Sequence, residues 1–128
     1  IIKPALKKGK LVITDRFADS TFVYQGYVNN FGLQNSIKLH RLLLNNFLPS
    51  KTFLFFIKPE EIIKRLKKRN KLNKFDKSDI SFHKKVITGY KKISKNKKRF
   101  ILIDANKEFK QIQEFLQLEI NKLLSKNG

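Results

Sequence analysis

The sequence predicts an α/β domain with a mostly parallel sheet. Three short apolar runs are typical of buried strands, and they occupy residues 10–14, 52–57 and 100–103. The last two are continuous rather than alternating, as expected of strands that are covered on both faces. Apolar residues at helical spacing lie between and after these runs, and this alternation favours parallel strands joined by right-handed crossovers. Ligands bind beyond the carboxyl ends of strands in such a sheet, so the residues there are the first site candidates.

The first predicted strand lies between Gly9 and Asp15, and a helical pattern follows over residues 33–48. After the second predicted strand, Pro59-Glu60-Glu61 opens a helix that reaches about residue 70. Proline suits the first turn of a helix, and acidic side chains suit the positive end of its dipole. These signals predict a helix that starts directly behind the sheet.

Two further helices are expected toward the C-terminus. Ser78 is a suitable N-cap, because its hydroxyl can accept a hydrogen bond from an N–H group of the first turn. An apolar stripe at helical spacing follows over residues 82–93, and a terminal helix is expected over residues 112–123. The basic segment at about residues 67–77 links two helices and is either a lid or a simple loop.

The composition favours one folded cytoplasmic domain. Hydrophobic residues make up 41% of the 128, which is too many for a disordered chain. No apolar run approaches the roughly 20 residues that a membrane span requires, so no membrane partner is expected. The lack of Cys excludes disulfides and thiolate metal sites. The chain begins at Ile1 and contains no Met, so we expect a processed, truncated or partial chain.

The net charge of +19 is compatible with nucleic-acid binding, because clustered cations release counterions from phosphates. However, only five of the 29 basic residues are Arg, and the lysines are scattered over most of the chain. Such scatter indicates biased residue usage and solvated surface lysines. We therefore expect no specific nucleic acid, and keep a basic nucleic-acid-binding protein as the alternative from another functional class.

Asp15 and Arg16 come directly after the first predicted strand. The guanidinium group of Arg16 can hold a phosphate with two hydrogen bonds. The carboxylate of Asp15 can hold Mg²⁺ through water, as carboxylates do in nucleotide enzymes. Taken alone, the pair also fits a structural salt bridge or a helix cap.

Four polar residues after this pair extend the pattern. Ser20, Thr21 and Tyr24 lie at helical spacing, so their hydroxyls and the Tyr24 ring can face one ligand. Gln25 adds an amide that both donates and accepts, as the edge of a pyrimidine requires. The alternative is that Tyr24 is a core aromatic and Gln25 a surface amide.

Residues 15–26 (DRFADSTFVYQG) resemble the thymidylate kinase motif D-R-[YFH]-x-x-S-x-x-A-Y-Q-G. Pro4-Ala5-Leu6 with Gly9 resembles that family's P-A-L-x-x-G. The resemblance covers nearly all of the chain and implies a P-loop nucleoside monophosphate kinase-like parallel sheet with flanking helices and a short basic lid. It also implies a dTMP site in which Arg16 contacts the monophosphate, while Ser20 or Thr21, Tyr24 and Gln25 lie around the base and sugar.

A second, partial match begins at Leu48-Pro49 and resembles the family's L-x-P-D-x-T-x-x-L-D-x-x-P-E. The family's acidic positions are here Ser50, Phe56 and Lys58, so any polar role of those positions in relatives does not carry over. After the last predicted strand, Asp104-Ala105 resembles the family's I-D-A, near where relatives place the adenine.

Arg65 and Arg69 are four residues apart and resemble the family's R-x-x-x-R at the start of the lid. The family's lid continues D-R-[FIY]-E, but this chain has Asn73-Lys74 in place of Asp-Arg, and Lys cannot grip a phosphate with two bonds. The resemblance implies that Arg65, Arg69 and Lys74 close over the phosphates of ATP. The alternative is that they are solvated helix cations.

The resemblance implies catalytic roles for Asp15, Arg16, Arg65 and Arg69, with Mg²⁺ held by Asp15 and ATP as co-substrate. The reaction would transfer the γ-phosphoryl group of ATP to dTMP, giving dTDP for dTTP synthesis. Relatives are homodimers. Another nucleoside monophosphate or deoxynucleoside kinase is the alternative within the enzyme class. Neither His40 nor His83 is assigned a metal or acid–base role, because no further ligand accompanies them.

One family feature is missing from these residues. The sequence contains no G-x-x-x-x-G-K-[ST], the loop whose N–H groups cradle phosphates. In the family that loop and its strand precede the Pro4 region. We therefore expect residues 1–128 to be a single partial domain, the C-terminal part of such an enzyme without its N-terminal strand and P-loop, and inactive alone.

Overall fold

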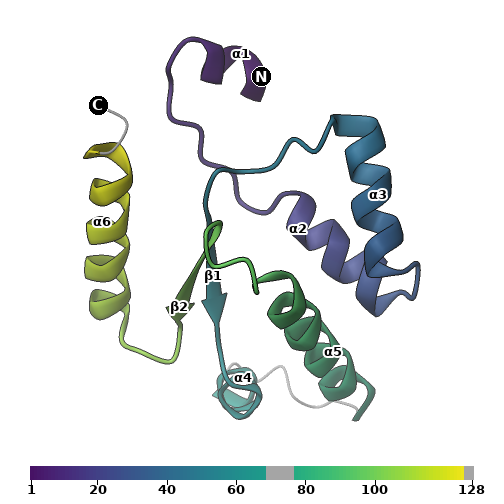
Figure 1. The fold of residues 1–128 in the computed structure, drawn as a ribbon. Coiled ribbons are helices and arrows are strands. Elements are labelled where there is room, and N and C mark those ends of the chain that lie inside the picture. The colour runs from purple at the N-terminus through teal and green to yellow at the C-terminus, as the bar shows by residue number, and fades with distance from the viewer. Residues whose placement is uncertain (69–76, 126–128) are drawn as a thin grey trace. The chain divides into compact units, whose positions relative to one another are not determined.

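The computed structural model describes residues 1–68 and 77–125. The chain forms two compact units, Ile1–Leu48 and Pro49–Gly128, each with its own internal packing. The first is helical, and the second holds two strands with three helices in its described part (Figure 1). The lid predicted at about residues 67–77 lies almost wholly outside the described residues, as do Arg69, Asn73 and Lys74.

The first unit contains α1 (Ile2–Lys7), α2 (Ala18–Thr21), the π-helix η1 (Phe22–Val28) and α3 (Leu33–Leu44). The helix expected over residues 33–48 is therefore confirmed, although it ends at Leu44. The next residue, Asn45, has φ 49° and leaves the helix in the left-handed conformation, which Asn tolerates better than most residues.

Helix α1 ends in a glycine turn. Gly9 has φ 71°, and its N–H donates to the carbonyl of Leu6 at 2.9 Å. The next N–H, of Lys10, reaches back to the carbonyl of Ala5 at 3.1 Å. This pair of bonds is a Schellman motif, in which glycine is favoured because a Cβ is strained at positive φ.

The strand predicted over residues 10–14 is wrong. The segment has no regular secondary structure, and Leu11 and Ile13 are 63% and 80% exposed. An apolar run becomes a strand only when a neighbouring strand takes up its backbone hydrogen bonds. No other segment in the described first unit is a strand, so the run has no such partner there.

The core of the first unit lies where α2 and η1 pack together and η1 meets α3. Val23 is fully buried, and Phe22, Val28 and Ala18 are nearly so. His40 of α3 lies edge-on to the Phe22 ring, with 5.4 Å between ring centroids. Its Nε2 lies 2.9 Å from the carbonyl oxygen of Phe47, which ties the helix to the chain that follows it. His40 is thus a structural residue.

The second unit contains β1 (Thr52–Phe56), α4 (Pro59–Lys68), α5 (Lys77–Ile93), β2 (Phe100–Asp104) and α6 (Phe109–Ser125). The two strands pair in parallel, with Thr52 opposite Phe100 and Phe56 opposite Asp104, and lie side by side in Figure 1. The predicted α/β class with a parallel sheet is therefore confirmed in this two-stranded form. The prediction of Ser78 as an N-cap is wrong, because α5 begins one residue earlier.

Helix α4 starts as its sequence predicts. The carbonyl of Lys58 accepts hydrogen bonds from the N–H groups of Glu61 and Ile62, at 3.0 and 3.2 Å. Pro59 occupies the first helical position, where the missing N–H costs nothing. In the described residues no helix is long and apolar enough to cross a membrane.

Truncation of Val23 to Ala tests the core of the first unit. Val23→Ala removes two methyl groups from a fully buried position, so the free energy of unfolding should fall by about 2 kcal/mol. Urea denaturation followed by circular dichroism measures this change. Leu118→Ala on α6, where the side chain is 54% exposed, is the control and should change the free energy by less than about 0.5 kcal/mol. Equal midpoints for the two variants would contradict this core.

Candidate functional site

Arg16 has an unusual backbone conformation. Its φ is 63°, in the left-handed region where residues other than Gly, Asn and Asp are uncommon. The hydroxyl of Thr14 donates to the carbonyl of Arg16 at 3.2 Å and supports this turn. Strained conformations cluster at functional sites, where they aim a side chain that a relaxed backbone would direct elsewhere.

The Arg16 side chain brings together two other predicted residues. Its Nε donates to Ser20 Oγ at 3.1 Å, and its guanidinium carbon lies 4.9 Å from the centroid of the Tyr24 ring. The hydroxyl and the ring thus hold the planar group in one orientation. A guanidinium carries further donors on its two Nη atoms, which suit a phosphate. We name Arg16, Ser20 and Tyr24 the arginine cluster.

The π-helix η1 carries Tyr24 and Gln25. The carbonyl of Tyr24 accepts a hydrogen bond at 3.0 Å from the N–H of Asn29, five residues along the chain, as π winding requires. Such winding is rare and occurs frequently at functional sites. Tyr24 is half-buried, while Thr21 and Gln25 are exposed. The expected helical spacing therefore holds as far as Thr21, and a wider turn follows.

Gln25 has a partner that the sequence reasoning missed. Asn29 Nδ2 donates to Gln25 Oε1 at 3.0 Å, a contact between exposed side chains four residues apart. Amide pairs at this spacing are a known helical signal, so the pattern Gln-x-x-x-Asn could have indicated it. The contact restricts the amide that was predicted to face the base.

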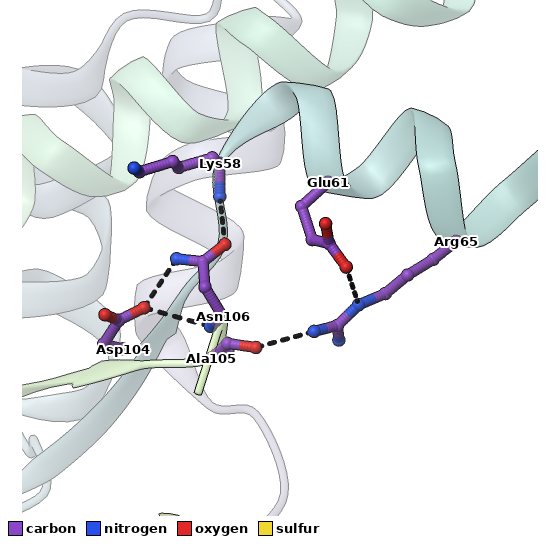
Figure 2. Close-up of polar contacts among 6 residues, drawn as sticks. All are labelled: Lys58, Glu61, Arg65, Asp104, Ala105 and Asn106. Carbon is purple, nitrogen blue, oxygen red and sulfur yellow. Dashed lines mark hydrogen bonds and ion pairs between the residues drawn. The ribbon is translucent and has the colours of Figure 1, made fainter. Parts of the chain in front are cut away.

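A second polar group lies at the carboxyl ends of the strands in the second unit (Figure 2). Arg65 of α4 donates from Nη2 to the carbonyl of Ala105 at 2.8 Å and from Nε to Glu61 Oε1 at 3.2 Å. The Arg65 side chain is 48% exposed, so its ion pair with Glu61 adds little stability. Its effect is to hold the guanidinium beside the end of β2.

The turn after β2 is closed by Asn106. The N–H and the side-chain amide of Asn106 both donate to Asp104 Oδ1, and Asn106 Oδ1 accepts from the N–H of Lys58 at 3.2 Å (Figure 2). The bonds from Asn106, with smaller contributions from Lys107 and Lys58, lower the pKa of Asp104 below its usual value. Sequence reasoning missed Asn106, although Asp-x-Asn after a strand is a recognisable turn signal.

Asp15 is exposed and is a single carboxylate. In the described part of the chain, no group of three or more acidic or His side chains could hold a metal ion on its own. Mg²⁺ in nucleotide enzymes takes one or two carboxylates, several waters and the phosphates of the substrate. An exposed carboxylate beside Arg16 fits that kind of site.

The sequence profile of the thymidylate kinase family matches residues 1–116. The chain belongs to the thymidylate kinase family. It is 37% identical over 129 residues to the thymidylate kinase of Bacillus velezensis, in an alignment that covers 98% of this chain and 60% of that protein. The thymidylate kinase of Mycoplasma capricolum is 39% identical over 127 residues, covering 96% of this chain and 60% of that protein.

The resemblance seen in the sequence is therefore confirmed. A further relative, the thymidylate kinase of a Geobacillus species, is 37% identical over 114 residues. This chain spans about 60% of the length of the Bacillus velezensis and Mycoplasma capricolum proteins. Thymidylate kinase membership implies a P-loop kinase fold, with which the parallel pair of strands and its helices agree.

Titration of the Asp104 carboxyl group tests whether its bonds with Asn106 lower its pKa. Since the folded-state pKa of Asp104 is lowered, its bonds stabilise the fold above the ordinary carboxyl pKa, and this stability is lost as pH falls through the lowered value. Asn106→Ala removes the side-chain bond but keeps the backbone one, so the Asp104 pKa should rise partway toward its usual value. Carboxyl-carbon NMR measures this shift.

Lys107→Gln is the matched control for that titration, because the side chain of Lys107 acts on the Asp104 carboxylate through its charge, and the substitution keeps the bond from the Lys107 N–H to the Asp104 carbonyl. It should raise the Asp104 pKa less than Asn106→Ala does. A larger shift in Lys107→Gln would mean that charge, rather than hydrogen bonding by Asn106, dominates this turn.

Proposed function

We propose that this protein transfers the γ-phosphoryl group of ATP to dTMP, giving ADP and dTDP for dTTP synthesis. The observation that carries the proposal is that Ser20 and Tyr24 both contact the exposed guanidinium of Arg16. All three residues are members of the family motif. Family membership supports the same reaction. We further propose a P-loop nucleoside monophosphate kinase-like sheet with a basic lid, and a cytoplasmic location.

In this proposal the arginine cluster holds dTMP. Arg16 binds the monophosphate through its Nη donors, while Ser20 holds the guanidinium through Nε. Tyr24 supports the guanidinium from its ring face and borders the sugar, Thr21 adds a hydroxyl, and Gln25 meets the base. Holding dTMP, the phosphoryl acceptor, in this way accelerates the transfer by positioning, without a covalent intermediate.

Arg65 is assigned to the ATP side, together with Arg69 and Lys74. Its contacts with Glu61 and Ala105 keep the guanidinium near the end of β2. There it would neutralise the negative charge that spreads over the phosphate oxygens in the transition state. Asp15 would hold Mg²⁺ through water. When bound, the ion supplies positive charge that neutralises the phosphate oxygens.

An assay of dTDP formation by the full-length protein tests the reaction, with dTMP, dUMP and AMP as competing acceptors. The proposal expects the highest kcat/KM with dTMP. A preference for AMP would instead make the protein a different nucleoside monophosphate kinase. No transfer to any acceptor, combined with salt-sensitive binding to DNA or RNA, would replace the kinase by the nucleic-acid alternative.

Replacing Arg16 by Lys tests the arginine cluster. Lys keeps the charge but offers no planar fork, and it cannot reproduce both the Ser20 bond and a bidentate phosphate contact. We expect kcat/KM for dTMP to fall about 100-fold in Arg16→Lys, as measured by steady-state kinetics. Arg41→Lys, at an exposed arginine of α3 outside the cluster, is the control and should retain wild-type kinetics. Equal rates for the two variants would remove Arg16 from the site.

We also propose that the protein is a homodimer. Three leucines of α3, Leu39, Leu42 and Leu43, are 46%, 79% and 71% exposed, which provides an apolar surface of the kind that self-association buries. Leu42→Glu should convert the dimer to a monomer in size-exclusion chromatography with light scattering, whereas Leu118→Glu on α6 should not. A monomeric wild type at micromolar concentration would overturn the proposal.

A further inference from the structure

Gly26 lies at a contact that leaves no room for a side chain. It is buried on η1, and a Cβ at this position would lie 2.3 Å from Ser36 Oγ and 3.1 Å from Ser36 Cβ. The same Cβ would lie 3.2 Å from Leu33 Cα, a backbone atom of α3 that cannot rotate away. Glycine therefore allows η1 and α3 to approach more closely than any other residue would permit.

This close approach accompanies the wide winding of η1. The carbonyls of Gln25 and Gly26 accept hydrogen bonds from the N–H groups of Phe31 and Gly32, at 3.3 and 2.8 Å. These partners are six residues along the chain, beyond even the π spacing. Gly32 has φ 96° and turns the chain directly into α3. The end of η1 is thus held by the same turn that delivers α3 against Gly26.

The contact is held on the α3 side as well. Ser36 Oγ donates to the carbonyl of Leu33 at 2.8 Å, and the Ser36 N–H donates to the carbonyl of Gly32 at 3.0 Å. Asn35 Nδ2 donates to the carbonyl of Phe31 at 2.9 Å. Ser36 is buried, so relief of a clash at Gly26 requires either rotation of a bonded hydroxyl or movement of α3.

We infer that Gly26 is a positioning residue for the dTMP site. It is buried and has no side chain with which to contact a substrate; its packing against Ser36 and Leu33 fixes the winding of η1 and, through it, the placement of Tyr24 and Gln25. These two residues directly precede Gly26, so a shift of the backbone at Gly26 displaces both of them relative to Arg16. The inference rests on the proposed function, which assigns Tyr24 and Gln25 to dTMP.

The central experiment is the Gly26→Ala variant of the full-length protein. The added methyl group requires Ser36 Cβ and the Leu33 backbone to give way by a few tenths of an ångström, and it requires the Ser36 hydroxyl to move further. We expect the KM for dTMP to rise about tenfold while the KM for ATP stays unchanged, because only the base-side residues move. A merely structural role would lower the amount of active enzyme, and hence the apparent kcat, without changing the KM for dTMP.

Two control variants separate crowding from general destabilisation. Gly9→Ala introduces backbone strain at φ 71°, but its Cβ would meet nothing within 4 Å. It should lose thermal stability and keep the wild-type KM for dTMP. Ser36→Ala, combined with Gly26→Ala, removes the nearest clashing atom, so the double variant should have a KM between those of wild type and Gly26→Ala.

A folded Gly26→Ala enzyme with the wild-type KM for dTMP overturns the inference, and so does a Gly9→Ala enzyme with an equally raised KM. If Gly26→Ala does not fold, the double variant is compared with wild type, and an unchanged KM overturns the inference. If the wild type forms no dTDP, the proposed function fails instead, and the NMR signals of the Tyr24 ring still test the positioning. Unchanged Tyr24 signals in the double variant would overturn it.

Discussion

The positions of the polar groups at the carboxyl ends of the strands depend on one backbone hydrogen bond, which continues the pairing of β1 and β2 past the end of both strands. The N–H of Ala105 donates to the carbonyl of Phe56 at 2.8 Å, although both strands are ending there. This bond holds the chain after β2 against the chain that enters α4. The carbonyl of Ala105 can then accept from Arg65, and the Asn106 side chain can accept from Lys58. This backbone bond thus places the groups that Arg65 and Lys58 contact, and Figure 2 shows those contacts.

In the first unit the corresponding constraint is a division of η1 into a packed side and a polar side. Phe22, Val23 and Gly26 are buried, whereas Gln25 is exposed and Tyr24 is partly so. The apolar side supplies the free energy that holds the segment in place, since burial of Phe and Val side chains outweighs the loss of rotamer freedom. The polar side is then available to Arg16, whose strained backbone is tolerated because packing next to it keeps the segment fixed.

Local signals predicted the elements that depend on local chemistry, and contacts between separate segments explain the wrongly predicted strand and the missed π winding. Pro59 with two following acids correctly placed the start of α4, and the uninterrupted apolar runs correctly placed β1 and β2. The run at residues 10–14 looks the same in sequence, but a strand needs a partner that its own residues cannot specify. The motif grouped Arg16, Ser20 and Tyr24, while the π winding beside them accompanies the close approach of α3 to Gly26. No local pattern carries that information.

The biased composition makes the few arginines informative. In a chain whose cations are mostly Lys, three of the four arginines in the described residues make directed contacts that use the shape of the guanidinium. Arg16 bonds to Ser20 and lies over the Tyr24 ring, and Arg65 joins Glu61 to the Ala105 carbonyl. Arg99 donates to Thr52 Oγ1 and stacks on the Phe100 ring at the start of the sheet. An ammonium group has neither the planar face nor the fixed fork that these contacts use. Arginine therefore stands mainly where geometry, rather than charge alone, is required, and Arg16 and Arg65, two of the three arginines that we assign to nucleotide phosphates, are among these positions.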